Sequence, residues 1–317
     1  MKIGIDLGGT KTEGLLIDSE GKELAKKRIQ TEKNYQGTIN GILTIVSEFE
    51  KKFGTVNSIG IGMPGAISFD SSLIKNANSI WLNSKPLKKD LEDQLKRKIN
   101  LENDANCFAL SEAVDGAGID HPVVFGAILG TGVGGGIIVN KKVLQGRNKI
   151  GGEWGHITLP NRTEDEKKYI KKCYCKKEGC LETYISGPGF ASIYNLRNNT
   201  NLDSFQIIKE YPQNQKSLIA LENYVDHLAR GLSVVINILD PDIIVLGGGM
   251  SNVDYIYENI NNKIKRTIYT RGTGTTGKDL SRYVNQFSLI PNGDDFEFPK
   301  NKKIVVRGEL VMRNNVW

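Results

Sequence analysis

Long apolar stretches are missing from this sequence. None of its 317 residues belongs to an uninterrupted run of eighteen apolar residues, so we expect no membrane-spanning helix and no membrane partner. Residues 1–6 read as the start of a strand and include an acidic side chain, so we expect no signal peptide and a cytoplasmic location. The formal net charge of +6 is spread along the chain, which favours a solvated surface over a nucleic-acid interface.

Histidine and cysteine are also rare, with three and four residues. Cys107 stands alone in an apolar, helix-like stretch and is expected in the core. The remaining cysteines follow one histidine closely in the sequence: His156, Cys173, Cys175 and Cys180. In a chain without a secretion signal, such a cluster binds metal more often than it forms disulfides. One His and three Cys predict a closed, structural zinc site that folds the lysine-rich loop 160–177, which has too few apolar residues to order itself.

Strand and helix patterns alternate along the chain, as in α/β proteins. The expected strands are 3–7, 14–18, 58–63, 98–102, 123–129, 136–140 and 243–249, and the expected helices are 38–53, 104–114 and 218–239. The order strand, glycine turn, strand occurs near residue 1 and again near residue 123, which indicates an internal duplication. We therefore expect two α/β domains, 1–117 and 118–317, around a cleft.

Glycine-rich turns follow three of the expected strands. Such a turn brings backbone N–H groups close to phosphate oxygens. The first two turns lead into strands, so they match neither a P-loop nor a Rossmann fingerprint, which lead into helices. Ordinary hairpin turns are the alternative, and the third turn could serve only strand-to-helix packing. The candidate ATP-binding residues are Asp6, Gly9, Thr10, Lys11, Gly130, Thr131, Gly132, Gly247, Gly248 and Gly249. Asp6 is also where a magnesium-binding carboxylate would sit, with a turn cap as the alternative.

Asp104 follows Asn103 at an expected strand-to-helix junction. Phosphoryl transfer to a hydroxyl needs a carboxylate that accepts the hydroxyl proton, and the carboxyl end of a strand is a usual place for one. Aspartate is also a favoured helix N-cap, so both interpretations of Asp104 stay open at this point.

These motifs together resemble the ROK family (repressors, open reading frames and sugar kinases), in order from residue 1 to about residue 272. Further stretches that carry the resemblance are 75–79, 81–83, 103–107, 111–116, 152–156, 179–183 and 237–242. Within the family the chain looks most like bacterial fructokinases of the mannokinase/fructokinase type. The resemblance implies a two-domain, actin-like (ribonuclease H-like) ATPase fold and a homodimer.

The resemblance also implies an activity and the residues behind it. The activity is ATP-dependent phosphoryl transfer to a hexose 6-hydroxyl, first of all from D-fructose to fructose 6-phosphate. Mannose, glucose or an N-acetylhexosamine are alternatives, as is a sugar-binding regulatory protein; a repressor of the family would need a helix-turn-helix, for which we see no room before Lys2. Asp104 looks like the catalytic base, and Asp6 would hold magnesium through water. The implied sugar ligands are Gly65, Asn78, Asn103, Glu153, His156 and Glu182, with the other ring nitrogen of His156 on zinc.

The sequence departs from the family pattern at two places. Lys176 stands where the family usually has a glycine after the second cysteine of the zinc loop. The segment after Gly272 is polar and does not resemble the family's usual ending, so we expect an atypical C-terminal tail.

Overall fold

The computed structural model describes residues 1–169, 172–264, 266–267 and 289–290. The chain forms two compact units. One contains Met1–Ile119 and Lys141–Gly151, and the other contains Asp120–Asn140 and the described residues from Gly152 onward. No sequence feature indicated that Lys141–Gly151 belongs with the first unit. Apart from strand residues 289–290, the tail after Gly272 lies outside the described residues.

The elements alternate as expected for an α/β protein. The strands are β1 (Lys2–Leu7), β2 (Lys11–Ile17), β3 (Glu23–Gln30), β4 (Ser58–Met63), β5 (Ala66–Ile67), β6 (Ile74–Lys75), β7 (Asn100–Asn103), β8 (Val123–Leu129), β9 (Val133–Val139), β10 (Lys142–Val143), β11 (Ile243–Gly247) and β12 (Leu289–Ile290). The α-helices are α1 (Tyr35–Phe53), α2 (Leu87–Leu95), α3 (Asp104–Asp115), α4 (Glu164–Lys168), α5 (Glu182–Ile185), α6 (Gly187–Asn198), α7 (Ser204–Glu210), α8 (Gln215–Leu239) and α9 (Asp254–Ile264).

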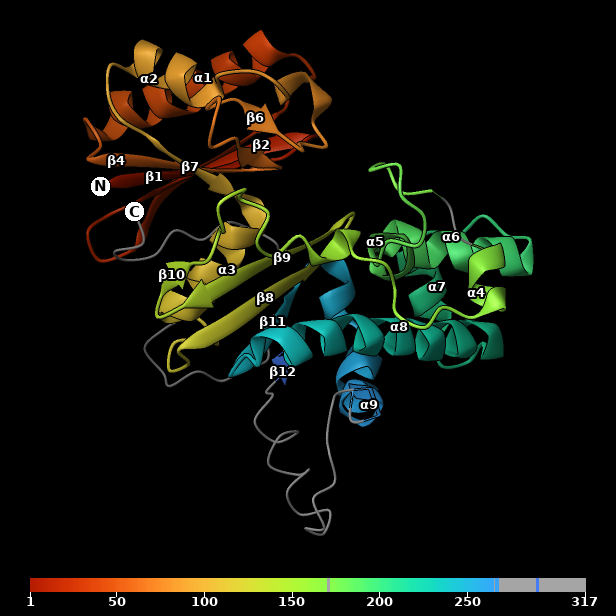
Figure 1. The fold of residues 1–317 in the computed structure, drawn as a ribbon. Helices are drawn as coiled ribbons and strands as arrows, with labels where there is room; N and C mark the ends of the chain where they lie inside the picture. The colour runs from red at the N-terminus through yellow and green to blue at the C-terminus, as the bar shows by residue number, and fades with distance from the viewer. Residues whose placement is uncertain (170–171, 265, 268–288, 291–317) are drawn as a thin grey trace. The chain divides into compact units, whose positions relative to one another are not determined.

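The first unit is built on a sheet with the strand order β3-β2-β1-β4-β7. Strand β1 is antiparallel to β2 and parallel to β4, and β4 is parallel to β7. Figure 1 shows α1 and α2 over one face of this sheet. Helix α1 comes close because Gly14 of β2 has no side chain: a Cβ there would lie 2.3 Å from Cγ2 of Ile45. The buried isoleucines of β1, β4 and α1 form the core of this unit.

The second unit repeats this plan with the strand order β9-β8-β11-β12. Strand β8 is antiparallel to β9 and parallel to β11, as β1 is to β2 and β4. The duplication predicted from the two glycine-containing hairpins is therefore confirmed. Helix α8 buries one apolar face and packs against α9. It begins three residues before the expected start, because the Asn214 side chain accepts a hydrogen bond from Lys216 N at 2.9 Å and caps the helix there.

None of the helices in the described ranges is both long and apolar enough to cross a membrane, in agreement with the expectation from the sequence.

Helix α4 is anchored to α8 by one carboxylate. Glu166 belongs to a capping box: its backbone N–H donates to Thr163 Oγ1 (3.2 Å), and its carboxylate accepts from Thr163 N (2.8 Å). The same carboxylate is 2.9 Å from His227 Nε2 and accepts from the Arg230 guanidinium. Arg230 also donates to the carbonyl of Pro160 at 2.8 Å. Residues 160–168 therefore have anchoring contacts that do not involve the cysteines, whereas the dependence of loop 160–177 on a metal stays a prediction.

Burial raises the pKa of Glu166, but hydrogen bonds from His227 and Arg230 outweigh it and hold the pKa well below its usual range. A depressed folded-state pKa stabilises the fold fully above the unfolded value of about 4.3, and this stabilisation is lost as the pH falls further. Glu166→Gln should lower the free energy of unfolding at pH 7 by about 3 kcal/mol, because the buried Arg230 loses its buried carboxylate and keeps only the exposed Asp226 as an acidic partner. It should also flatten the decline of stability below about pH 4.5, measured by urea unfolding.

Glu164→Gln is the matched control, since Glu164 is an exposed residue of the same helix that pairs with Lys167. This variant should keep both the stability at pH 7 and the acid dependence of the unsubstituted protein. Equal unfolding curves for Glu166→Gln and Glu164→Gln would contradict the proposed anchor.

Candidate functional site

Asp104 is the first residue of α3, directly after β7. The cap of this helix is Asn103, whose side-chain oxygen accepts from the backbone N–H of Ala105 (3.0 Å) and of Asn106 (3.2 Å). Capping is therefore done by Asn103, and the alternative interpretation of Asp104 as the N-cap is wrong. The Asn103 amide nitrogen donates to the carbonyl of Gly65 at 3.0 Å. An amide has a second N–H, which this bond does not use.

Asp6 and Asp104 lie in the same region of the first unit. Both act on the thiol of Cys107: burial raises its pKa well above the usual value, and the charges of Glu102, Asp104 and Asp6 raise it further. Glu102, which the sequence analysis missed, accepts from Asn106 Nδ2 at 3.0 Å and from the Gln145 side chain. Gln145 belongs to the returning segment Lys141–Gly151, so this carboxylate fixes that segment beside α3.

The first glycine turn, residues 8–11, is the tip of the β1–β2 hairpin, as predicted. Gly8 N donates to Lys11 O at 3.1 Å, and Thr31 Oγ1 donates to Gly8 O at 2.9 Å. Gly9 lies on this turn next to Ser79, and Thr10 and Lys11 are exposed. The hydrogen bond from Thr31 fixes this turn, and the residues at its tip are exposed, so the turn is suited to contact a ligand.

Gly65 and Asn78 lie in loops of the first unit. Gly65 has φ +81°, and a Cβ there would lie 2.5 Å from the carbonyl oxygen of Lys75, so only glycine fits. Asn78 is exposed beside Ala77, whose backbone N–H and carbonyl are both bonded at 2.9 Å to the Asn83 side chain. The surrounding loop is therefore fixed, while Asn78 is open to solvent.

A cavity of about 790 Å³ opens at the second and third glycine turns. Its lining consists of Leu129, Gly130, Thr131, Gly187, Pro188, Ala191, Asp203, Ser204, Phe205, Ile208, Gly249, Met250, Asn252 and Val253. Gly248 has φ +84°, and a Cβ there would lie 2.7 Å from the backbone of Leu129. Close packing therefore requires Gly248, as the packing interpretation of the third turn expects, whereas Gly249 lines the cavity and its contact with a nucleotide stays a prediction. Gly247 ends the buried strand β11.

Gly132 belongs to the second turn but contacts another candidate residue. Glu182 Oε2 accepts from the backbone N–H of Val133 at 3.0 Å, and a Cβ on Gly132 would lie 2.9 Å from that oxygen. The carboxylate of Glu182 is thereby fixed against the turn. A side chain at Gly132 would displace Glu182, so a substitution there would not disturb nucleotide contacts alone.

Glu153, His156 and Glu182 form one polar cluster in the second unit. Burial raises the pKa of Glu153; His156 lowers it and the charge of Glu182 raises it. Glu182 Oε1 is 3.8 Å from Cys173 Sγ, and His156 Nε2 is 2.8 Å from the hydroxyl of Tyr174. The three predicted sugar ligands of this unit therefore lie beside the cysteine cluster.

The predicted metal ligands come together. One ligand atom from each of His156, Cys173, Cys175 and Cys180 lies within 4.8 Å of all the others. His156 Nδ1 is 3.5 Å from Cys173 Sγ, and the sulfurs of Cys175 and Cys180 are 3.5 Å apart and not bonded to each other. Three thiols and one imidazole are the donor set of closed tetrahedral zinc sites, so these residues fit that ion.

The loop that carries the cysteines turns at Lys176, with φ +71°. A positive φ explains why a glycine is the usual residue here, since other side chains are strained in this region. Lys176 N donates to Cys173 O at 2.9 Å, and Cys173 N donates to Lys177 O at 3.1 Å, which closes the turn. The departure from the family pattern at Lys176 therefore leaves the turn intact.

Phe205 is a candidate that sequence analysis missed. It lines the 790 Å³ cavity from α7, and 74% of its surface is exposed. An exposed aromatic ring beside glycine turns is a ready stacking partner for a flat ligand. A phenylalanine in a short helix is typical of a core residue, so the sequence gives no sign that Phe205 could contact a ligand.

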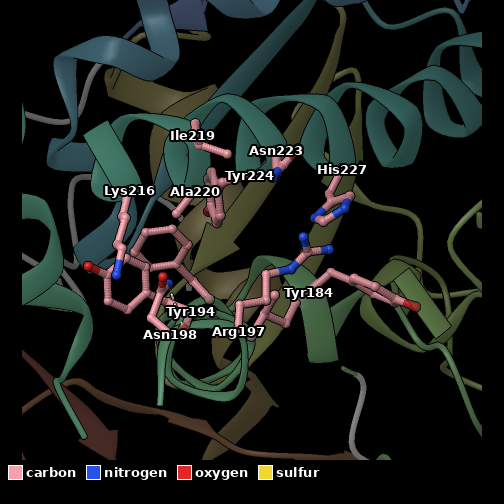
Figure 2. A pocket seen from close by; sticks show the side chains of 12 residues that line it. Tyr184, Tyr194, Arg197, Asn198, Lys216, Ile219, Ala220, Asn223, Tyr224 and His227 are labelled. Carbon is pink, nitrogen blue, oxygen red and sulfur yellow. Dashed lines mark hydrogen bonds between the residues drawn. The ribbon is translucent and has the colours of Figure 1, made fainter. Parts of the chain in front are cut away.

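A second cavity, of about 200 Å³, lies between α6 and α8 (Figure 2). Tyr194, Arg197 and Asn198 line it from α6, and Lys216 and Asn223 are among the residues that line it from α8. Arg197 is already paired with Asp165 at 2.5 Å. None of the predicted site residues lines this cavity, so it is separate from the candidate site.

Known proteins are similar to this chain in sequence and in fold. The model of the ROK family matches residues 2–279. The chain is 39% identical over 264 residues to an N-acetyl-D-glucosamine kinase of Pectobacterium atrosepticum, covering 81% of this chain and 86% of the relative. It is also 39% identical over 272 residues to the enzyme of the same name from Escherichia coli O1:K1 / APEC, covering 84% and 89%.

Two solved structures are similar over most of their length. A ROK family glucokinase from Streptomyces griseus in complex with glucose and AMPPNP has a TM-score of 0.71 and 26% identity, covering 86% of this chain and 90% of that one. A ROK hexokinase from Thermus thermophilus has a TM-score of 0.73 and 27% identity, covering 84% and 88%. The expected actin-like, ribonuclease H-like fold is confirmed, whereas the fructokinase subtype stays a prediction, since both relatives are named for another sugar. The chain belongs to the ROK family.

Proposed function

We propose that this protein is an ATP-dependent sugar kinase that transfers the γ-phosphoryl group to the 6-hydroxyl of a hexose. The observation that carries the proposal is the β7–α3 junction. Asn103 caps the helix, and Asp104 stands beside the cap at the carboxyl end of a strand, in the same region as Asp6. A carboxylate at this position can accept the proton of the attacking hydroxyl.

N-acetyl-D-glucosamine is the first candidate for the sugar. Two relatives that are 39% identical over more than four-fifths of this chain carry the name of that activity. D-Fructose, which the sequence motifs favoured, is the second candidate, followed by mannose and glucose. All these sugars have a primary hydroxyl that Asp104 could deprotonate, so the reacting group does not distinguish one sugar from another.

In the proposed reaction Asp104 accepts the proton of the sugar hydroxyl as its oxygen attacks the γ-phosphorus. Backbone N–H groups of the first two glycine turns bind phosphate oxygens, with Thr10 and Thr131 adding hydroxyl donors. Asp6 would hold a magnesium ion through water. When bound, this ion would neutralise phosphate charge. The adenosine would lie in the 790 Å³ cavity, with Gly249 allowing close approach of the base.

The sugar hydroxyls would be bound by Gly65, Asn78, Asn103, Glu153, His156 and Glu182. Asn103 can donate its second amide N–H, because the first is bonded to Gly65 O. His156, Cys173, Cys175 and Cys180 would hold a zinc ion, which supplies a rigid cross-link when bound and keeps no open ligand position. His156 Nδ1 faces the cysteines, so a metal held there would fix the orientation of the ring and leave Nε2 for the sugar.

The proposal is tested by measuring ADP release from ATP with N-acetyl-D-glucosamine, fructose, mannose or glucose, each against a blank without sugar. We expect sugar-dependent ADP release, fastest with N-acetyl-D-glucosamine. Sugar binding by calorimetry without ADP release from any member of the panel would instead identify a sugar-binding regulatory protein.

Phe205→Ala should raise the KM for ATP by at least about fivefold, because stacking of a base on an aromatic ring is worth on the order of 1–3 kcal/mol. The KM for the sugar should stay unchanged. Phe69→Ala is the matched control, since Phe69 is 69% exposed in the other unit and should leave both constants unaltered. An unchanged KM for ATP in Phe205→Ala would show that the Phe205 ring does not contact the nucleotide.

A further inference from the structure

Tyr174 holds a position that the reaction scheme leaves unexplained. It lies between two of the clustered cysteines, Cys173 and Cys175, and its hydroxyl is 2.8 Å from His156 Nε2. The two rings meet edge to face, with centroids 5.0 Å apart and planes at 84°. Although 61% of the residue is exposed, its hydroxyl is directed to the imidazole.

His156, the partner of this hydroxyl, offers a single hydrogen-bond donor. His156 Nδ1 faces the cysteines, 3.5 Å from Cys173 Sγ, and a nitrogen that ligates a metal carries no proton. With a metal held by Nδ1, the ring proton would be on Nε2, and Nε2 would donate to the Tyr174 oxygen. One N–H group makes one well-directed hydrogen bond. A sugar hydroxyl that accepts from Nε2 therefore needs the position that the Tyr174 oxygen occupies.

The other proposed sugar ligands of this unit, Glu153 and Glu182, lie in the neighbourhood of the same hydroxyl. The carboxylates of Glu182 and Glu153 are close enough for their charges to act on it. The phenol oxygen thus occupies a position against the His156 imidazole that a sugar hydroxyl would take. Most of Tyr174 is exposed, so we expect its ring to turn away from His156 when a sugar arrives.

We propose that Tyr174 competes with the sugar for His156 Nε2 and thereby sets the sugar affinity of this protein. This inference rests on the proposed function of the site. Because the bond is exchanged on binding, Tyr174 affects the affinity for the sugar and leaves the chemical step unaltered. Phenylalanine keeps the edge-to-face ring contact and removes only the competing oxygen.

The test compares Tyr174→Phe with the unsubstituted protein in steady-state kinetics and in sugar titration by calorimetry without nucleotide. The KM and Kd for the sugar should fall by roughly three- to tenfold, the worth of one net hydrogen bond. The kcat, the KM for ATP and the zinc content should not change. Tyr169→Phe, five residues earlier, is the control: its ring stacks under Arg197, which phenylalanine preserves.

An unchanged or raised sugar KM in Tyr174→Phe would overturn the proposal, and a raised one would make the hydroxyl a sugar ligand. Failure of the proposed function is a different result: the unsubstituted protein would then phosphorylate no sugar of the panel. Zinc content measured in the same preparation shows whether the loop is folded in the variant.

Discussion

Asp104→Asn should lower kcat by a factor of roughly 10² to 10⁴, the usual worth of a positioned general base. Asparagine has nearly the same shape but does not accept the hydroxyl proton. Asn103 caps α3 through its own side chain, so the helix should keep its start and the protein its stability. Sugar binding, ATP binding and zinc content should stay near those of the unsubstituted protein, measured by calorimetry and elemental analysis.

Asp93→Asn is the matched control for this variant. Asp93 is an exposed residue of α2 in the same unit, and its replacement should leave kcat unaltered. An Asp104→Asn protein with a kcat within a few-fold of the control would show that Asp104 is not the base.

Cys175→Ser, or treatment with a strong chelator, should abolish sugar binding and phosphoryl transfer. The loss follows because His156, a proposed sugar ligand, takes its orientation from the metal cluster, and Glu182 Oε1 contacts Cys173. The melting temperature should fall only moderately, since Glu166 and Arg230 anchor α4 independently of the cysteines. ATP binding should stay detectable, and the unsubstituted protein should contain about one zinc per chain, as expected of a single closed site.

Cys107→Ala serves as the control for zinc content. Cys107 is the buried fourth cysteine and lies outside the cluster, so its replacement should leave the metal content at about one zinc per chain. A fully active preparation of the unsubstituted protein that contains no metal and binds sugar normally would contradict the zinc site.

Several features of the fold could be predicted because local chemistry dictates them. Glycines 8, 9, 130 and 132 lie between apolar stretches, and this pattern favours hairpins. The apolar stripe at Ile39, Ile42 and Val46 could only belong to a helix with one buried face. The cluster of one histidine and three cysteines was equally visible, since its members are close in sequence.

Other features depend on contacts between distant residues, which a local pattern does not encode. The return of Lys141–Gly151 to the first unit involves Gln145 and Glu102, which are 43 positions apart. Glu166 and Arg230 are 64 positions apart, so the anchor of α4 had no local signal. Phe205 looks like a core residue until the cavity beside it is known. That Asn103 and not Asp104 is the N-cap of α3 is visible only in the backbone bonds of the folded chain, and the role of Asp104 as a base stays a prediction.

The most direct test of the account is identification of the product by ³¹P and ¹H NMR after incubation with Mg-ATP and N-acetyl-D-glucosamine. The account predicts one new phosphomonoester resonance coupled to the two C6 protons of the sugar, formed with an equal amount of ADP and formed at least about 100-fold more slowly with Asp104→Asn. If no phosphorylated sugar formed from N-acetyl-D-glucosamine, fructose, mannose or glucose, or if Asp104→Asn formed it at an undiminished rate, the account would be contradicted.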